Sequence, residues 1–318
     1  MYLCYDLGGT NIKAGLIDKS GHIHNKKNIP TQVEGNLEGV LQQFKDIADR
    51  MLEENSISKE HILGAGLGVP GFVDMEKGVV TTAVNLGWHD VPITKRLAEY
   101  LPYPAFVIND ANAAALGEMW KGAGQNYRDL MCITLGTGIG GGVIINGTVH
   151  NGTNGYAGEV GHIRVKDHGR RCNCGKTGCL ETEASASALA FYGEKAVRDG
   201  VATMLADKMK DAGTITSKDV VEAAAFGDAA AQEIVNQAAY YLGFALANMY
   251  MVIAPGRIVI GGGLAAAGDI LFKPVIKWFN EFSLTEIKGE EIIYPAQLGN
   301  DAGMIGLARL VDLNLKTL

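Results

Sequence analysis

The sequence of 318 residues lacks the features that mark membrane, secreted and nucleic-acid-binding proteins. No apolar run reaches the roughly 20 residues that a transmembrane helix needs, and Met1 leads straight into a strand-like segment without a basic and hydrophobic leader. The charges form no long block of one sign, and a net charge of -7 disfavours nucleic acid as a partner. We expect a globular cytoplasmic protein, with no membrane or nucleic-acid partner, whose thiols stay reduced and can ligate metal.

Cysteine is scarce, with five in the chain, yet three of them lie in one short stretch after a histidine. Cys172, Cys174 and Cys179 follow His162, and a set of three thiolates and one imidazole is typical of tetrahedral zinc. Such a zinc would be structural, because no coordination position is left for an activated water. The alternative is a loop of free thiols. Buried cysteines normally scatter through apolar strands, as the other two cysteines do, so the cluster favours zinc.

The length favours two domains, and the order of the apolar segments favours an α/β fold. Strands are predicted at 2–6, 12–18, 62–69, 106–108, 130–135 and 258–260, with a further strand ending at Ile145. Helices are predicted at 37–54, 93–101 and 111–120 and from about Asp301, with long helical stretches at 182–211 and 228–253. This alternation predicts mixed sheets covered by helices.

Glycine is abundant, with 42 residues, nearly twice its usual share of roughly 7%. A unit of strand, glycine turn and strand occurs twice, with Gly8-Gly9-Thr10 in the first turn and Gly136-Thr137-Gly138-Ile139-Gly140 in the second. Glycine lets backbone N–H groups approach phosphate closely, so two such hairpins could hold a polyphosphate. Neither turn matches the Walker sequence or a dinucleotide fingerprint, and each taken alone could be a plain hairpin.

Polar side chains beside these turns suit a magnesium nucleotide. Asp6 precedes the first turn and could hold Mg2+ through water, while the hydroxyls of Thr10 and Thr137 could donate to phosphate oxygens. Lys13 could assist electrostatically, and an exposed strand lysine is an equally good interpretation. The repetition of the unit favours phosphate binding over two plain hairpins.

Asn109 and Asp110 stand at the junction between a predicted strand and a helix that begins at Ala111. A carboxylate there can face the crevice at the carboxyl end of the strand, where open α/β sheets bind ligands. It can equally serve as the N-cap of the helix, because Asp is a favoured N-cap residue. Local chemistry leaves both roles of Asp110 open.

Five motifs occur in order along the chain: Asp6-Leu-Gly-Gly-Thr10, Asn109-Asp110-Ala-Asn112, Leu135-Gly-Thr-Gly-Ile-Gly-Gly-Gly142, Gly158-Glu-Val-Gly-His162 and Cys172-Asn-Cys-Gly-Lys-Thr-Gly-Cys-Leu-Glu181. Together they resemble the ROK family of sugar kinases and repressors over nearly the whole chain. The resemblance implies the two-domain actin/hexokinase-like (ribonuclease H-like) ATPase fold with an interdomain cleft. The first α/β domain would comprise residues 1–110 plus 301–318, and the second would comprise 111–300 with the zinc-binding loop. Repressor members carry a DNA-binding region before the first hairpin, which we expect to be absent because five residues precede Asp6.

The resemblance also implies roles for individual residues. Asp110 would be the catalytic base. The sugar contacts would be Gly71, Asn85, Asn109, Asp110, Glu159, His162 and Glu181. The nucleotide contacts would be Asp6, Gly8, Gly9, Thr10, Asn11, Lys13, Gly136, Thr137, Gly138 and Gly140, with Gly261, Gly262 and Gly263 at the adenosine. The zinc ligands would be His162, Cys172, Cys174 and Cys179. A plain strand-to-helix turn remains a reasonable interpretation of the last three glycines.

The sequence and the resemblance together predict an enzyme that phosphorylates D-glucose at O6, using ATP and Mg2+, with structural Zn2+, in a homodimer or homotetramer. Mannose, fructose or N-acetylmannosamine as substrate, polyphosphate as donor, a non-catalytic sugar sensor and a zinc hydrolase are the alternatives. The intact Asp110 and both hairpins favour the kinase over the sensor, and a zinc with four protein ligands disfavours the hydrolase. The predicted pocket lacks a basic side chain, which disfavours an anionic sugar.

Overall fold

The structure is a computed structural model and describes residues 1–31 and 37–316. The strands in these ranges are β1 (Tyr2–Leu7), β2 (Asn11–Ile17), β3 (Ile23–Pro30), β4 (Gly64–Val69), β5 (Phe72–Asp74), β6 (Val79–Ala83), β7 (Trp88–Val91), β8 (Ala105–Asn109), β9 (Leu130–Leu135), β10 (Ile139–Ile145), β11 (Thr148–Val149), β12 (Arg257–Gly261) and β13 (Ile293–Pro295). The α-helices are α1 (Leu37–Glu54), α2 (Ile93–Leu97), α3 (Asp110–Lys121), α4 (Leu180–Ala184), α5 (Ala186–Arg198), α6 (Leu205–Ala212), α7 (Ser217–Ala225), α8 (Ala229–Ile253), α9 (Asp269–Phe282), α10 (Gly289–Ile292) and α11 (Ala302–Leu315).

The chain folds into two compact units. The first unit contains residues 1–128, 142–158 and 298–318, and the second contains 129–141 and 159–297. Helix α3 belongs to the first unit, whereas the sequence predicts it in the second domain. The domain limits 1–110 plus 301–318 and 111–300 stay a prediction.

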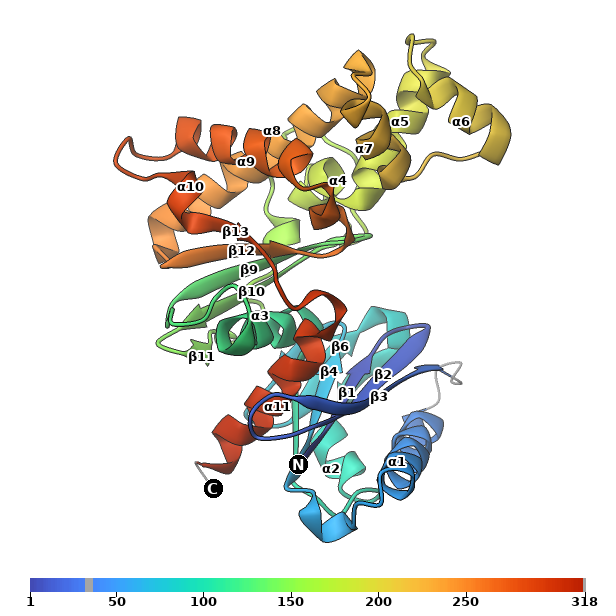
Figure 1. The fold of residues 1–318 in the computed structure, drawn as a ribbon, viewed down its shortest axis with the longest axis vertical. Coiled ribbons are helices and arrows are strands. Elements are labelled where there is room, and N and C mark those ends of the chain that lie inside the picture. The colour runs from blue at the N-terminus through green and yellow to red at the C-terminus, as the bar shows by residue number, and fades with distance from the viewer. Residues whose placement is uncertain (32–36, 317–318) are drawn as a thin grey trace. The chain divides into compact units, whose positions relative to one another are not determined.

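The two five-stranded sheets share one strand order. The first sheet runs β3-β2-β1-β4-β8 and the second runs β11-β10-β9-β12-β13, so in both the first strand of the set is central (Figure 1). In the first sheet β1 and β2 are antiparallel, whereas β1, β4 and β8 are parallel. The carboxyl ends of these parallel strands therefore meet at one edge, which carries Asp6, Gly71 and Asn109.

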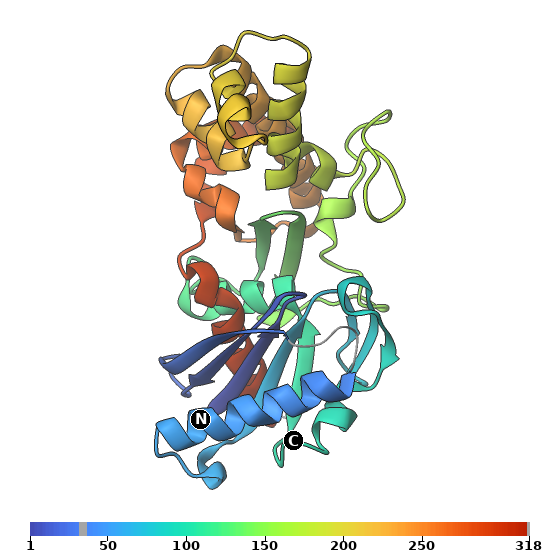
Figure 2. The same cartoon turned by 90° about the vertical axis from the view of Figure 1, so that its right-hand side faces the viewer.

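The strand β1 places alternate side chains on the two faces of the first sheet. Leu3, Tyr5 and Leu7 belong to a core shared with α1, which runs across this face (Figure 2). On the other face the hydroxyl of Tyr2 donates to Asp312 of α11 at 3.0 Å. Because helices cover both faces, the strand is apolar almost throughout instead of alternating apolar and polar residues.

The helix α11 crosses α3, and the two backbones approach each other closely (Figure 1). A Cβ at Gly306 would lie 1.7 Å from the backbone oxygen of Ala113, and a Cβ at Gly117 would lie 2.1 Å from the oxygen of Ala302. No side chain larger than hydrogen fits at either position without moving a helix. The crossing thereby sets the place of α3, whose first residue is Asp110.

Residues 72–91 form a small sheet of order β5-β6-β7 that the sequence did not predict. Its strands contain three, five and four residues, too few for a clear alternating pattern. Gly71 leads the chain into β5 with φ of +116°, and a Cβ there would lie 2.2 Å from the backbone oxygen of Thr82. The entry to this sheet therefore requires glycine.

The second unit adds helices to its sheet strands. The 25-residue α8 packs against α9, α7 and α4. The helical stretch expected at 182–211 is wrong as a continuous element, because it contains the end of α4, all of α5 and most of α6. Ser185 interrupts it by capping α5, with its hydroxyl accepting from the N–H of Ala188 at 3.1 Å. No helix within 1–31 and 37–316 combines the length and the apolarity required to cross a membrane.

Replacing Gly306 with alanine tests the crossing of α3 and α11. We expect Gly306→Ala to lower the free energy of unfolding by roughly 2 to 3 kcal/mol, because the added methyl group forces the two backbones apart. Gly303→Ala is the matched control one turn earlier in α11, where a Cβ would have its nearest neighbour at 3.7 Å. Urea unfolding of both variants measures the difference, and equal midpoints would contradict the assignment.

Candidate functional site

The first glycine hairpin, residues 7–11, joins β1 to β2 in the first unit. The N–H of Gly8 donates to the oxygen of Asn11 at 2.8 Å and closes the turn. Thr31 secures it from the side of β3, since its N–H donates to the oxygen of Thr10 at 2.8 Å and its hydroxyl to the oxygen of Gly8 at 3.1 Å. Gly9, Thr10 and Asn11 are exposed. The bonds to Thr31 therefore fix the backbone of the turn while its tip faces solvent.

Asp6 lies on the α11 face of β1, where a Cβ at Gly303 would be 3.7 Å from its carboxylate. Burial raises the pKa of Asp6, and Lys13 acts in the opposite direction. The Lys13 Nζ is 3.6 Å from Asp6 Oδ2, so Lys13 is a partner of this carboxylate and not simply a solvated strand residue. A half-buried carboxylate of this kind is suited to a cation or a water bound to one.

Asn109, and not Asp110, is the N-cap of α3. The Oδ1 of Asn109 accepts from the N–H groups of Ala111 and Asn112 at 2.9 and 3.1 Å, and its Nδ2 donates to the oxygen of Gly71 at 3.0 Å. Asp110 is the first helical residue and is exposed. Its Oδ1 also accepts from the N–H of Ala111 at 2.9 Å. The capping role is therefore filled by Asn109, which leaves the Asp110 carboxylate at the carboxyl edge of the first sheet.

Asn85 lies in the short 3-10 turn Val84–Leu86 and is exposed. A Cβ at Gly9 would lie 3.8 Å from the Cβ of Asn85, so this predicted sugar contact is a neighbour of the first hairpin.

The sequence analysis gave no role to two asparagines near Asp110, namely Asn112 of the second motif and Asn151. Asn112 is 2% exposed, and its Nδ2 donates to Oδ1 of Asn151 at 3.4 Å. Asn151 in turn donates to the oxygen of Val73 at 2.8 Å and borders a cavity of about 560 Å3 lined by 74–77, Thr81 and 151–156. The signal that could have identified the loop is the repeated Asn-Gly pair at 151–152 and 154–155, which is typical of tight turns.

The second glycine hairpin, residues 135–141, lies in the second unit. The N–H of Gly136 donates to the oxygen of Gly138 at 2.9 Å, and Thr137 is exposed at the tip. Gly140 lies in β10. The oxygen of Gly136 accepts from the N–H of Ala186 at 2.9 Å, which ties the hairpin to the start of α5.

The third glycine group lies beside this hairpin. Gly261 ends β12, and Gly263 begins the 3-10 turn Gly263–Ala267. Gly262 has φ of +85°, and a Cβ there would lie 2.4 Å from the oxygen of Leu135. This glycine therefore lets two backbone segments meet, which a plain strand-to-helix turn does not require.

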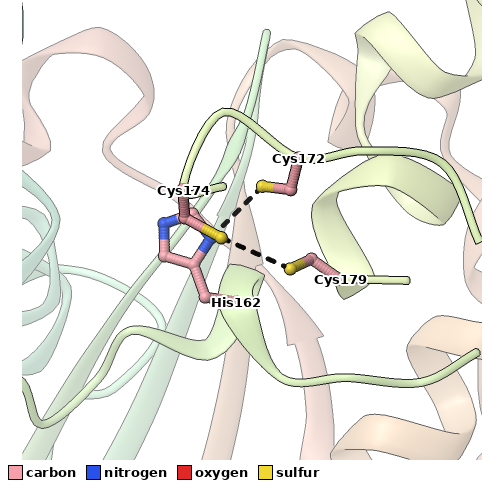
Figure 3. Close-up of side chains that lie close together, drawn as sticks. All are labelled: His162, Cys172, Cys174 and Cys179. Carbon is pink, nitrogen blue, oxygen red and sulfur yellow. Dashed lines mark hydrogen bonds between the residues drawn. The ribbon is translucent and has the colours of Figure 1, made fainter. Parts of the chain in front are cut away.

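The four predicted metal ligands converge in the second unit (Figure 3). The donor atoms of His162, Cys172, Cys174 and Cys179 all lie within 4.8 Å of one another. The Sγ atoms of Cys174 and Cys179 are 3.6 Å apart, and Nδ1 of His162 is 3.6 Å from Sγ of Cys172. Two thiolates on one tetrahedral zinc, with bonds of roughly 2.3 Å, would be about 3.8 Å apart. The donor set and its spacing fit zinc, and no pair among these cysteines has the roughly 2 Å separation of a disulfide.

An ion pair that is buried only on its glutamate side anchors the segment before the cysteines to the rest of the second unit. Lys166 Nζ lies 3.1 Å from Oε2 of Glu183, whose side chain is fully buried and also accepts from the hydroxyl of Tyr192 at 2.7 Å. Burial raises the pKa of Cys172 and Cys179, so a bound cation is needed to hold both as thiolates near neutral pH.

Glu159 and His162 lie three residues apart around a 3-10 turn, Val160–His162, and face each other. Nε2 of His162 is 3.8 Å from Oε2 of Glu159. The histidine thus turns Nδ1 to the cysteines and Nε2 away from them. Burial is the main cause of the raised pKa of Glu159, and Glu181 adds to it while His162 opposes it.

The structure therefore places the predicted residues in two groups, each within one unit. The first unit contains the first hairpin, Lys13, Asp6, Gly71, Asn85, Asn109 and Asp110. The second unit contains the second hairpin, Gly261–Gly263, Glu159, Glu181 and the metal cluster.

Comparisons with known proteins agree over nearly the whole chain. A model of the ROK family matches residues 2–313. A glucokinase of Halalkalibacterium halodurans is 45% identical, and the match covers 98% of this chain and 94% of that protein.

Solved structures of ROK family proteins are also similar to this chain over nearly its whole length. A ROK family glucokinase from Streptomyces griseus in complex with glucose and AMPPNP has a TM-score of 0.77 at 34% identity, covering 98% of this chain and 99% of its own. A ROK hexokinase from Thermus thermophilus has a TM-score of 0.81 at 32% identity, covering 100% and 99%. The expected actin/hexokinase-like ATPase fold is confirmed.

Proposed function

The chain belongs to the ROK family, and we propose that it phosphorylates D-glucose at O6 with ATP as donor, giving glucose 6-phosphate. The observation that carries the proposal is the exposed carboxylate of Asp110 at the start of α3, where Asn109 serves as the helix cap. Its support is the 45% identity to a glucokinase over 98% of this chain. An intact general base and two glycine hairpins favour a kinase over a non-catalytic sensor.

In the proposed reaction Asp110 accepts the proton of the sugar's O6 hydroxyl as that oxygen attacks the γ-phosphorus of ATP. The new O6–P bond forms while the bond from phosphorus to the β,γ-bridging oxygen breaks, and ADP leaves. Asn109 holds the adjacent backbone rigid through its cap and its bond to Gly71. A fixed carboxylate raises the effective concentration of the base at the reacting hydroxyl.

The proposed sugar contacts favour a neutral hexose. Asn85, Asn109 and Asp110 come from the first unit, and Glu159, His162 and Glu181 come from the second. The set contains three carboxylates and no lysine or arginine, which disfavours a phosphorylated or carboxylated substrate. Sites that hydrogen-bond hydroxyl groups reject analogues that leave those partners unpaired, so epimers of glucose should differ strongly in kcat/KM.

The two glycine hairpins are the proposed contacts of the ATP phosphates, and Gly261–Gly263 that of the adenosine. Asp6 is the proposed residue for Mg2+, which when bound would offset negative charge on the phosphates. Lys13 beside it supplies positive charge in the same region. Thr10 and Thr137 are both exposed in the hairpin turns, and their hydroxyls are the proposed donors to phosphate oxygens.

The metal we propose is structural zinc, held by His162, Cys172, Cys174 and Cys179. When bound, zinc would fix the tautomer and the direction of His162, since Nδ1 faces the cysteines. Nε2 then carries the ring proton and can donate to a sugar hydroxyl. We also propose that the protein forms a homodimer or homotetramer, which rests on the family resemblance. Its proposed location in the cytoplasm rests on composition.

A coupled assay tests the proposed substrate. We expect the highest kcat/KM for D-glucose with Mg-ATP when glucose, mannose, fructose and N-acetylmannosamine compete in one reaction, because the polar set suits several equatorial hydroxyls. Polyphosphate replaces ATP in a parallel series. A higher kcat/KM for one of the other sugars would overturn the choice of glucose, and turnover of none of them would overturn the kinase.

The variant Asp110→Asn tests the catalytic base. It keeps size and hydrogen-bonding capacity but cannot accept the proton, so we expect kcat to fall by roughly two to four powers of ten. Sugar affinity, measured by calorimetry, should stay within a few-fold of the wild type. Near-normal turnover would show that Asp110 serves only the helix.

Elemental analysis tests the metal. We expect one zinc per chain, and Cys174→Ser should lower both zinc content and sugar affinity because His162 and Glu181 lose their support. Cys4→Ala is the control, since this buried thiol of β1 lies outside the cluster. A metal-free protein with full activity would contradict the assignment.

A further inference from the structure

We propose that Glu181 holds the second glycine hairpin in its nucleotide-binding shape, in addition to its proposed contact with the sugar. The inference rests on the proposed nucleotide role of that hairpin. Glu181 would then be a positioning residue that connects the cysteine loop to the second glycine hairpin, both of which belong to the second unit.

The first observation is a direct contact between Glu181 and the hairpin. Its Oε2 accepts from the backbone N–H of Ile139 at 3.0 Å. Ile139 directly follows the turn of Gly136, Thr137 and Gly138 and begins β10. The hydrogen bond from its N–H therefore fixes the backbone at the end of the turn. A carboxylate acceptor makes the bond stronger than one between two neutral groups.

The second observation is the space that the carboxylate occupies. A Cβ at Gly138 would lie 2.2 Å from Oε2 of Glu181, although the φ of Gly138 does not lie in the left-handed region. A Cβ at position 138 would therefore take the space of the Glu181 carboxylate and force it to shift, whereas the backbone conformation of the turn does not itself call for glycine. The hairpin and the glutamate fit each other sterically as well as through a hydrogen bond.

The third observation is that α4 is a rigid support for this contact. The N–H of Leu180 donates to the oxygen of Ile163 at 2.8 Å, and the hydroxyl of Thr182 donates to the oxygen of Cys179 at 2.7 Å. The other carboxylate oxygen, Oε1, lies 3.7 Å from Sγ of Cys172. Glu181 thus stands between the cysteine cluster and the hairpin, with one oxygen directed to each.

Glu159 provides a comparison, because it is also a proposed sugar contact with a carboxylate in the same unit. Its Oε2 faces Nε2 of His162 at 3.8 Å instead of the hairpin. If both glutamates served only the sugar, their loss would affect sugar affinity alone. If Glu181 also positions the hairpin, its loss must weaken nucleotide binding when no sugar is present.

The same contact predicts coupling between the two substrates. A sugar hydroxyl that donates to Glu181 would restrict its side chain and thereby the hairpin, so bound sugar should tighten nucleotide binding. By linkage, nucleotide must tighten sugar binding by the same factor. Loss of the Glu181 side chain should remove this mutual effect.

The experiment measures the Kd of AMPPNP with Mg2+ in the absence of sugar, for the zinc-loaded wild type, Glu181→Ala, Glu181→Gln and Glu159→Gln. We expect Glu181→Ala to raise Kd about tenfold, the fold-change expected for loss of a hydrogen bond to a charged acceptor. Glu181→Gln keeps a side-chain oxygen that can accept from Ile139, so its Kd should stay within about threefold of the wild type. Glu159→Gln should leave Kd unchanged while weakening glucose binding.

Hydrogen exchange and a second variant keep the test independent of folding defects. Amide exchange in the peptide that covers residues 136–141 should be faster in Glu181→Ala and unchanged in Glu159→Gln. Gly138→Ala leaves the carboxylate in the chain but takes its space, and it should weaken AMPPNP binding to a similar extent. A wild type that does not bind AMPPNP would overturn the proposed function. A Glu181→Ala protein that binds AMPPNP and exchanges like the wild type would overturn this inference alone.

Discussion

The constraint on which both units depend is the close approach of backbones at glycine. In the first unit the crossing of α3 and α11 at Gly117 and Gly306 sets the position of the helix that begins with Asp110. In the second unit Gly161 and Gly262 let other segments meet the backbone of the second hairpin, at Ile139 and Leu135. A methyl group at any of these positions would move the elements that present the polar side chains. The glycines therefore act on the site through packing as well as through turn flexibility.

Half-buried carboxylates are the second common feature. Asp6, Glu159 and Glu181 are each only partly exposed, and each lies against a named partner: Lys13, His162 and the N–H of Ile139 respectively. Burial raises the pKa of Asp6 and Glu159, while Lys13 and His162 respectively act in the opposite direction. A cation at Asp6 and sugar hydroxyls at Glu159 would supply further partners.

The sequence was most informative where chemistry is local. The cysteine cluster and both glycine hairpins could be identified because few residue types suit each role and they lie close together in the chain. The predicted unit of strand, glycine turn and strand is present in both five-stranded sheets, as β1–β2 and as β9–β10. Helices α1 and α8 were predicted within a residue or two, since their apolar periodicity is long.

The predictions that failed or were missing depend on contacts between distant segments or on single residues. The strands β5 to β7 are too short to show a pattern. The stretch 182–211 looks helical throughout in the sequence, but Ser185 caps α5 and residues 199–204 separate α5 from α6. Asn112 and Asn151 are 39 positions apart, so only folding reveals that they meet.

The sequence by itself determined which residues could do the chemistry: the thiols and imidazole for zinc, the glycine turns for phosphate and a carboxylate at a strand-to-helix junction. Only the tertiary structure decided how these roles are divided. It gave the helix cap to Asn109 and left Asp110 exposed, and it directed one oxygen of Glu181 to Ile139 and the other to Cys172. The reason is physical: residue type sets what a group can bind, whereas the partner it binds depends on which distant backbone and side-chain atoms packing brings within about 3 Å.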